Sequence, residues 1–338
     1  MTKSAEHNSR LCAEAVAKSG VHSRFPRVSE QVECLTLGLE SLPKHAYNPS
    51  ILRNGGKLWM TYRYHFGGDA RTRLGICQLG DGGKVVKSAD LPISAFSVED
   101  ARLFSLHGEP WMSWVESQWE GKFENPRCIT KYAQLESYLD PLEPDEEIRR
   151  NQVLMGFKIN RQFQVKAGGN DMSSMQKNWC FFESDENLFC IFESWPEQIV
   201  FQIKGDAVIN EYRTKEVKWP YGPVRGGTIV PYDSKLLRFF HSATDYGIGR
   251  PEHRYFVGAA ILESKPPFAT IAISRKPVLY GSESDNFKSA ERKAIHHWKE
   301  SVAFPTGAIV DGDNFILAVG VNDCACALVR IKPEMLNL

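Results

Sequence analysis

Short apolar runs alternate with small polar clusters along this chain, and one arrangement of the two recurs five times. In each copy a polar cluster leads into an apolar run, a turn rich in Gly, Asn or Asp follows, and a second alternating run returns. Alternation with a period of two, closed by such turns, predicts β-hairpins. The five predicted hairpins cover residues 47–63, 97–116, 177–193, 225–241 and 305–323.

The spacers between the hairpins hold further strand candidates, such as residues 74–79 and 255–261, and no long amphipathic helix. A hairpin and two further strands make a four-stranded sheet, and radial repetition of such sheets protects their edges. The sequence therefore predicts an all-β, five-bladed β-propeller. A β-sandwich is also all-β, but it gives no reason for polar clusters to recur at matching positions. We expect residues 1–24 to form an N-terminal tail, partly disordered or helical, and residues 25–338 to form a single propeller catalytic domain.

The overall charge is balanced, with 41 Lys and Arg against 41 Asp and Glu among 338 residues. This balance predicts neither nucleic acid nor a membrane as a partner. The N-terminus has no apolar signal core, no stretch is long enough to span a bilayer, and the eight cysteines are scattered. We therefore expect a cytoplasmic protein with reduced thiols. The sequence leaves the oligomeric state open, a homo-oligomer included.

The two longest spacers, residues 131–176 and 275–301, are expected to carry loops or a short helix on one rim. His296 and His297 form the one adjacent histidine pair there, but a loop or capping contact explains them better than metal binding. We predict no metal site.

The polar clusters of the five hairpins are expected to converge. In a propeller the first strand of each hairpin lines the central channel, and the antiparallel second strand returns to the same end. The first strands would bring Asn48, Ser50, Glu99, Asp100, Arg102, Lys177, Asn178, Arg225 and Thr306 to this end. The second strands would bring Arg63, Glu116, Glu193, His241 and Asp323. The alternative is that these residues only cap blade starts and pair between blades.

One hairpin opens with two carboxylates, Glu99 and Asp100. Because neighbours on a strand point to opposite faces, we expect only one of them to face the channel. Arg102 would share the face of Asp100, and a nearby cation disfavours the protonated form that a general acid needs. Proton relay through the substrate, or an Arg102 turned to a neighbouring blade, would remove this conflict.

Glu99-Asp100-Ala101-Arg102 resembles the Glu-Asp-Pro-Arg motif of glycoside hydrolase family 130, the five-bladed β-mannoside phosphorylases and hydrolases. Ala101 replaces the proline of that motif. Further stretches resemble the family in the same order, at residues 177–179, 225–228, 239–241, 255–268, 275–279, 302–307 and 320–323. The related five-bladed β-1,2-mannosyltransferases are resembled almost equally well.

The resemblance implies that Asp100 is the catalytic acid, which protonates the glycosidic oxygen through a sugar hydroxyl while the anomeric carbon inverts. It implies a phosphate site built by Lys177, Arg225, His241 and Arg63, with inorganic phosphate as co-substrate and no other cofactor. The residues expected to contact the substrate are Asn48, Ser50, Glu99, Arg102, Asn178, Glu193, Thr306 and Asp323.

The predicted function is inverting phosphorolysis of a β-linked mannoside or related hexoside, or the reverse synthesis. The expected partner is an oligosaccharide or a sugar phosphate. A β-mannosyltransferase that uses an activated donor is an alternative, because the same cations would bind its phosphates. An inverting hydrolase is another, with Glu193 or Glu116 as the base across a gap of roughly 6.5–9.5 Å. A sugar-binding propeller without catalysis is the third.

Overall fold

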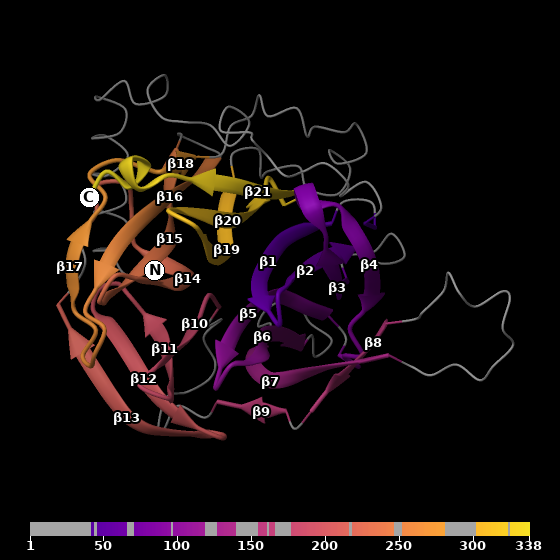
Figure 1. The fold of residues 1–338 in the computed structure, drawn as a ribbon. Helices are drawn as coiled ribbons and strands as arrows, with labels where there is room; N and C mark the ends of the chain where they lie inside the picture. The colour runs from indigo at the N-terminus through magenta and orange to yellow at the C-terminus, as the bar shows by residue number, and fades with distance from the viewer. Residues whose placement is uncertain are drawn as a thin grey trace, which may run out of the picture.

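The computed structural model contains five antiparallel sheets arranged in a ring (Figure 1). The predicted five-bladed β-propeller is therefore confirmed. The structure describes residues 42–43, 46–65, 71–95, 97–118, 127–139, 155–160, 162–165, 177–215, 218–246, 252–280, 302–323 and 325–338.

Each blade begins at the channel with the first strand of a predicted hairpin. Blade 1 contains β1 (Tyr47–Asn54), β2 (Lys57–His65), β3 (Thr72–Leu79) and β4 (Val85–Asp90). Blade 2 contains β5 (Ser97–Leu106), β6 (Glu109–Gln118), β7 (Arg127–Leu139), β8 (Met155–Ile159) and β9 (Phe163–Gln164). Blade 3 contains β10 (Cys180–Ser184), β11 (Asn187–Glu193), β12 (Gln198–Lys204) and β13 (Ala207–Thr214).

Blade 4 contains β14 (Arg225–Tyr232), β15 (Lys235–Tyr246), β16 (Glu252–Leu262), β17 (Thr270–Ile273) and β18 (Leu279–Tyr280). Blade 5 contains β19 (Ala303–Asp311), β20 (Asn314–Val321) and β21 (Ala325–Ile331). Two short 3-10 helices, Asp81–Gly83 and Pro333–Leu336, complete the described elements.

The hairpins form where the turn residues allow a left-handed backbone. The turn between β1 and β2 uses Gly55 and Gly56, with φ of 55° and 73°, and the turn between β5 and β6 uses His107 and Gly108, with φ of 54° and 76°. Two-residue turns of this hand match the twist of the flanking strands. This local chemistry explains why the hairpins could be predicted.

The hydrophobic core lies between neighbouring blades. Five apolar clusters of the described residues each join two adjacent blades, and the one between blades 5 and 1 closes the ring. The backbones approach closely there, because a Cβ added at Gly307 of β19 would overlap the backbone nitrogen of Ile51 on β1. The innermost strands β1, β5, β10, β14 and β19 contact one another around the channel (Figure 1).

The innermost strands share an irregularity near the same end of the channel. The pairing register slips after Tyr47 in β1, after Glu99 in β5, after Arg225 in β14 and after Pro305 in β19. Residues of left-handed backbone lie at this level in four blades: Asn48 (φ 48°), Asp100 (φ 51°), Asn178 (φ 75°) and Gly226 (φ 50°). Bulges of this kind redirect side chains and are frequent beside active sites.

Several predictions concern residues outside the described part of the chain. They include the tail at residues 1–24, the His296–His297 pair and most of both long spacers. Where the first spacer is described, it contains strands, since β7 continues to Leu139 and is paired by β8 and β9.

Candidate active site

A cavity of about 210 Å³ opens at the bulged end of the channel, and nine of the predicted site residues line it. They are Asn48, Arg63, Glu99, Asp100, Lys177, Asn178, Arg225, His241 and Asp323. Its wall therefore carries three cations, three carboxylates, two amides and one imidazole. We call Asn48, Arg63, Glu99 and Asp100 the acid side, and Asn178, Arg225 and His241 the anion side; Lys177 lies between them.

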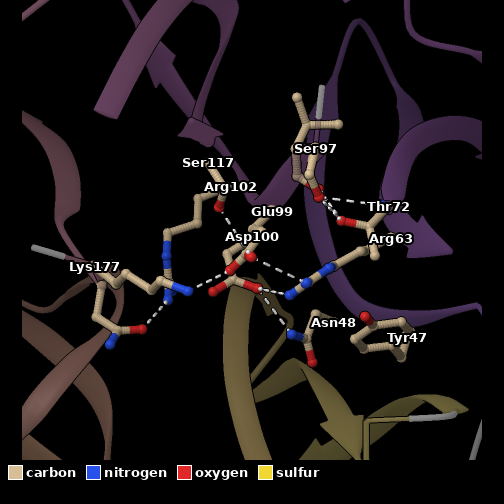
Figure 2. A network of polar contacts seen from close by, with 12 residues as sticks. Tyr47, Asn48, Arg63, Thr72, Ser97, Glu99, Asp100, Arg102, Ser117 and Lys177 are labelled. Carbon is tan, nitrogen blue, oxygen red and sulfur yellow. Dashed lines mark hydrogen bonds and ion pairs between the residues drawn. The ribbon is translucent and has the colours of Figure 1, made fainter. Parts of the chain in front are cut away.

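Asp100 is held by one of its two carboxylate oxygens. Its Oδ1 accepts a hydrogen bond from Asn48 Nδ2 at 2.9 Å and a second from Arg63 Nη1 at 3.4 Å (Figure 2). No described residue donates to Oδ2. The carboxyl group is thus fixed in orientation, while one oxygen is left for a substrate.

Glu99 is paired at both of its carboxylate oxygens. Its Oε2 accepts from Lys177 Nζ at 2.6 Å, and its Oε1 accepts from Ser117 Oγ at 3.1 Å and lies 3.3 Å from Arg63 Nη2 (Figure 2). Burial opposes the charged form of Glu99, but the two cations outweigh it and lower its pKa to about 2. Glu99 is therefore an ionised, hydrogen-bonded carboxylate at neutral pH.

Glu99 and Asp100 both reach the cavity, so the expectation that only one of them could face it is wrong. The expectation assumed an uninterrupted strand. The left-handed backbone of Asp100 and the register slip between Glu99 and Arg102 break the alternation at this point. As a result, Arg63 contacts both carboxylates.

Arg63 is supported from behind by an aromatic ring. Its guanidinium carbon lies 5.1 Å from the centre of the Tyr47 ring, and Tyr47 is 1% exposed. Burial opposes the charge of Arg63, but Tyr47 and the neighbouring carboxylates outweigh it, so the pKa of Arg63 is raised. Tyr47 was not predicted as a site residue, although it directly precedes Asn48 in the polar cluster of blade 1.

Arg225 and His241 face each other across the β14–β15 hairpin. Arg225 is exposed, and no described carboxylate lies within ion-pair distance of it. His241 is buried against Phe304, with ring centres 4.6 Å apart, and stacks on Tyr255 at 5.8 Å. Both aromatic residues line the cavity and were not predicted, although Phe304 directly precedes the predicted polar cluster of blade 5.

His241 is neutral at pH 7. Burial is the main reason that its pKa lies well below its usual value. Three nearby cations lower it further: Arg102, Arg225 and Arg238. A neutral imidazole offers one N–H donor, and its Nδ1 has no hydrogen-bond partner among the described residues.

Arg102 turns away from Asp100 and crosses to other blades. Its Nη1 donates to the carbonyl oxygens of Gly227 at 2.8 Å and Pro305 at 3.4 Å, and its Nη2 lies 3.5 Å from Asn178 Oδ1. Arg102 is therefore bound to neighbouring blades, and Arg63 rather than Arg102 is the cation that pairs with Asp100. Burial lowers the pKa of Arg102, whereas Asp100 raises it.

Five residues considered as site candidates are not on the cavity wall. Ser50, Thr306 and Arg102 lie beneath it, where Ser50 Oγ donates to the carbonyl oxygen of Thr306 at 3.0 Å and accepts from the backbone of Leu103 at 2.9 Å. They separate this cavity from a wider one of about 500 Å³ at the opposite end of the channel.

The two carboxylates considered as hydrolytic bases also lie off the wall. Glu116 accepts from Trp114 Nε1 at 3.1 Å and pairs with Lys131 at 2.8 Å, so both of its oxygens are engaged. Glu193 is exposed at the end of β11.

The described residues contain no group of three or more His, Cys, Asp or Glu side chains placed to hold a metal ion. Across the same residues, no helix has both the length and the apolar character needed to cross a membrane.

Sequence comparison gives no match, either to a family model or to a curated protein. Solved structures do match. A mannose phosphorylase from Leishmania mexicana, in complex with a phosphate ion, is 11% identical with a TM-score of 0.58, over 98% of this chain and 95% of that one. The β-1,2-mannobiose phosphorylase from Listeria innocua, bound to β-1,2-mannobiose, is 14% identical with a TM-score of 0.55, over 87% and 91%.

A third match is described as a glycoside hydrolase of family 130 that targets β-1,2-mannosidic linkages in Candida mannan. It is 14% identical with a TM-score of 0.55, over 86% of this chain and 85% of that one. This chain shares their fold. The resemblance to glycoside hydrolase family 130 is thereby confirmed at the level of the fold.

Proposed function

We propose that this protein catalyses the inverting phosphorolysis of a β-linked mannoside, or the reverse synthesis from mannose 1-phosphate. Asp100 is the acid, and Arg225, His241 and Lys177 hold the phosphate. One observation carries the proposal. A single cavity is lined both by a carboxyl group with one unengaged oxygen, Asp100, and by a cation that forms no ion pair with a described carboxylate, Arg225.

The reaction balances with these groups alone. The proton of Asp100 passes through a sugar hydroxyl to the glycosidic oxygen, and the bond from that oxygen to the anomeric carbon breaks. A phosphate oxygen attacks the same carbon from the opposite face, so a β-mannoside yields α-mannose 1-phosphate and the free acceptor sugar. The proton of the attacking hydrogen phosphate is released from the sugar phosphate and replaces the one that Asp100 gave up. Reverse synthesis runs the same transfers backwards and returns the proton to Asp100.

The anion side supplies the donors that a phosphate needs. Arg225 offers charge-assisted hydrogen bonds, and neutral His241 offers one N–H. Lys177 has three N–H donors, of which Glu99 takes one, so it can also bind an anion. The neutral imidazole of His241 adds a hydrogen-bond donor for phosphate without adding another positive charge next to Arg225.

The hydrolytic alternative has less support, because it requires a second carboxylate as a base. Glu116 is engaged at both oxygens and Glu193 is away from the wall. Glu99 does line the cavity, but two cations lower its pKa to about 2, which makes it a weak base. The non-catalytic alternative expects Asp100 to be held in a salt bridge with no room for a substrate. Arg63 does pair with Asp100 at 3.4 Å, but a cavity opens beside the carboxyl group, which favours a catalytic site.

The test is phosphate release from mannose 1-phosphate in the presence of mannose or a β-mannobiose as acceptor. We expect release by the wild-type chain. Arg225→Ala should raise the KM for phosphate in the phosphorolytic direction by ~10–100-fold, because hydrogen bonds to charged groups contribute about 1.5–3 kcal/mol. Arg213→Ala is the matched control. Arg213 lies on the outer strand β13 and pairs with Glu197 and Glu211, so its removal should leave the KM for phosphate unchanged.

Two results would contradict the proposal. Cleavage of a mannoside at the same rate with and without phosphate would identify a hydrolase. Transfer from a nucleotide sugar, with none from mannose 1-phosphate, would identify a transferase that uses an activated donor.

A further inference from the structure

Two buried arginines donate hydrogen bonds to the carbonyl groups of two consecutive residues next to the anion side. Arg238 on β15 donates from both Nε and Nη2 to the carbonyl oxygen of Gly226, at 3.0 and 2.6 Å. Arg102, which comes from blade 2, donates to the carbonyl oxygen of Gly227 at 2.8 Å. Both carbonyls of the bulge in β14 are thus held by guanidinium groups from different blades.

Burial of Arg238 is energetically unfavourable. It is 1% exposed, and no described carboxylate pairs with it. Burial lowers its pKa to about 10, so it remains charged at neutral pH. An unpaired buried charge destabilises a fold relative to an apolar side chain of similar volume. Packing alone therefore does not explain an arginine at this position.

The carbonyl that Arg238 holds belongs to a bulge that packs directly on the anion side. Gly226 and Gly227 have φ of 50° and 110°. A Cβ at Gly226 would lie 2.9 Å from Asn178 Cβ and 3.1 Å from His241 Cε1. A Cβ at Gly227 would overlap the carbonyl oxygen of Phe239. The bulge is closely packed on both sides, so a shift of its backbone would also move the residues that contact it.

We propose that Arg238 is a positioning residue of the anion side. It fixes the Gly226–Gly227 bulge, and through this bulge it places Arg225 and His241 for binding phosphate. This inference rests on the proposed function, because it takes inorganic phosphate as the occupant. Arg238 does not line the cavity and acts through the Gly226 carbonyl. Its charge also adds to the positive potential there and helps to keep His241 neutral.

The experiment measures binding of inorganic phosphate to the full chain by calorimetry, together with KM and kcat for both substrates. Arg238→Met keeps the approximate volume but removes the charge and both donors. We expect a phosphate Kd and KM at least ~10-fold higher, with the KM for the mannoside within about twofold. Arg238→Lys keeps the positive charge but cannot form the bidentate hydrogen bond to the Gly226 carbonyl, so it should recover part of the phosphate affinity.

Leu237→Ala is the control for a purely structural effect. Leu237 is fully buried on the same strand and packs between blades 4 and 5, away from the bulge. It should lower the melting temperature and leave the phosphate Kd unchanged. Should Arg238→Met not fold, Arg238→Lys carries the comparison.

The outcomes separate the two proposals. Wild-type binding of phosphate, with unchanged affinity in the Arg238 variants, overturns the role of Arg238 and leaves the proposed function standing. Equal losses of phosphate and mannoside affinity, seen also in Leu237→Ala, overturn it as well. A wild-type chain that binds no phosphate overturns the proposed function, and this inference with it.

Discussion

The two sides of the cavity differ in how their charges are balanced. On the acid side, Arg63 contacts both Glu99 and Asp100, and Lys177 adds a second cation to Glu99. On the anion side, Arg225 forms no ion pair with a described carboxylate and interacts with Glu193 only at longer range, and the imidazole of His241 is neutral. The acid side is therefore organised before any ligand binds, whereas the anion side needs a negative charge from a substrate. This difference supports the proposed phosphorolysis.

Asp100→Asn should have the largest effect, a loss of kcat that leaves phosphate binding on the anion side unchanged. Asparagine keeps the shape, the left-handed backbone and the Oδ1 acceptor, but it has no proton to give. Because general acid catalysis contributes ~10²–10⁴-fold, we expect kcat to fall by about 10³-fold. The phosphate Kd should stay within about twofold in calorimetry. A parallel loss of phosphate affinity would show that the two sides are not independent.

Glu99 should make the stability of the acid side depend on pH. Its pKa is about 2 in the folded chain, below the unfolded value of 4.5, so its contribution is present above about pH 4.5 and is lost as pH falls toward 2. The shift corresponds to about 3 kcal/mol. Urea unfolding of wild type and Glu99→Gln should show a gap at pH 7 that narrows below pH 4.5. A gap that stays constant over this range would contradict the assignment.

Asn48→Ala should have the smallest effect, confined to the acid side. It removes one hydrogen bond to Asp100, so we expect kcat to fall ~3–10-fold with the KM for phosphate unchanged. Gly320→Ala should act in the same direction, because its Cβ would overlap Asn48 Oδ1. Asn54→Ala is the control, since Asn54 lies at the other end of β1 and bonds Gly108 at 2.7 Å. Equal losses in both asparagine variants would refute a specific role.

The blades were predictable because their signals are local. Turn residues such as Gly55 and Gly108 and the alternation that follows them identify each hairpin without knowledge of its neighbours. The bulge at Asp100 was not predicted, because strand alternation assumes continuous pairing. Its only local signal is that Asn and Asp tolerate a left-handed backbone, and they recur at this level.

The structure brings nine of the predicted site residues to one cavity wall and places others behind it. Asn48 lines the wall, whereas Ser50, two residues on, bonds the next blade instead. A polar residue at a strand start suits either role, and the choice depends on contacts between blades that are far apart in sequence. Glu116 shows the same limit, since its partner Lys131 lies on a strand within a spacer expected to carry loops or a short helix.

The left-handed positions of the inner strands also bear on how such a chain can diverge. Asn48, Asp100, Asn178 and Gly226 occupy a backbone conformation that Asp, Asn and Gly adopt with the least strain. In the genetic code, aspartate is separated from asparagine and from glycine by one base. A duplicated gene can thus lose the carboxyl group at position 100 by a single base change that the backbone tolerates. With Asp100 as the proposed acid, such a copy would keep the cavity without turnover, and a reversal of the same change would restore the proposed activity.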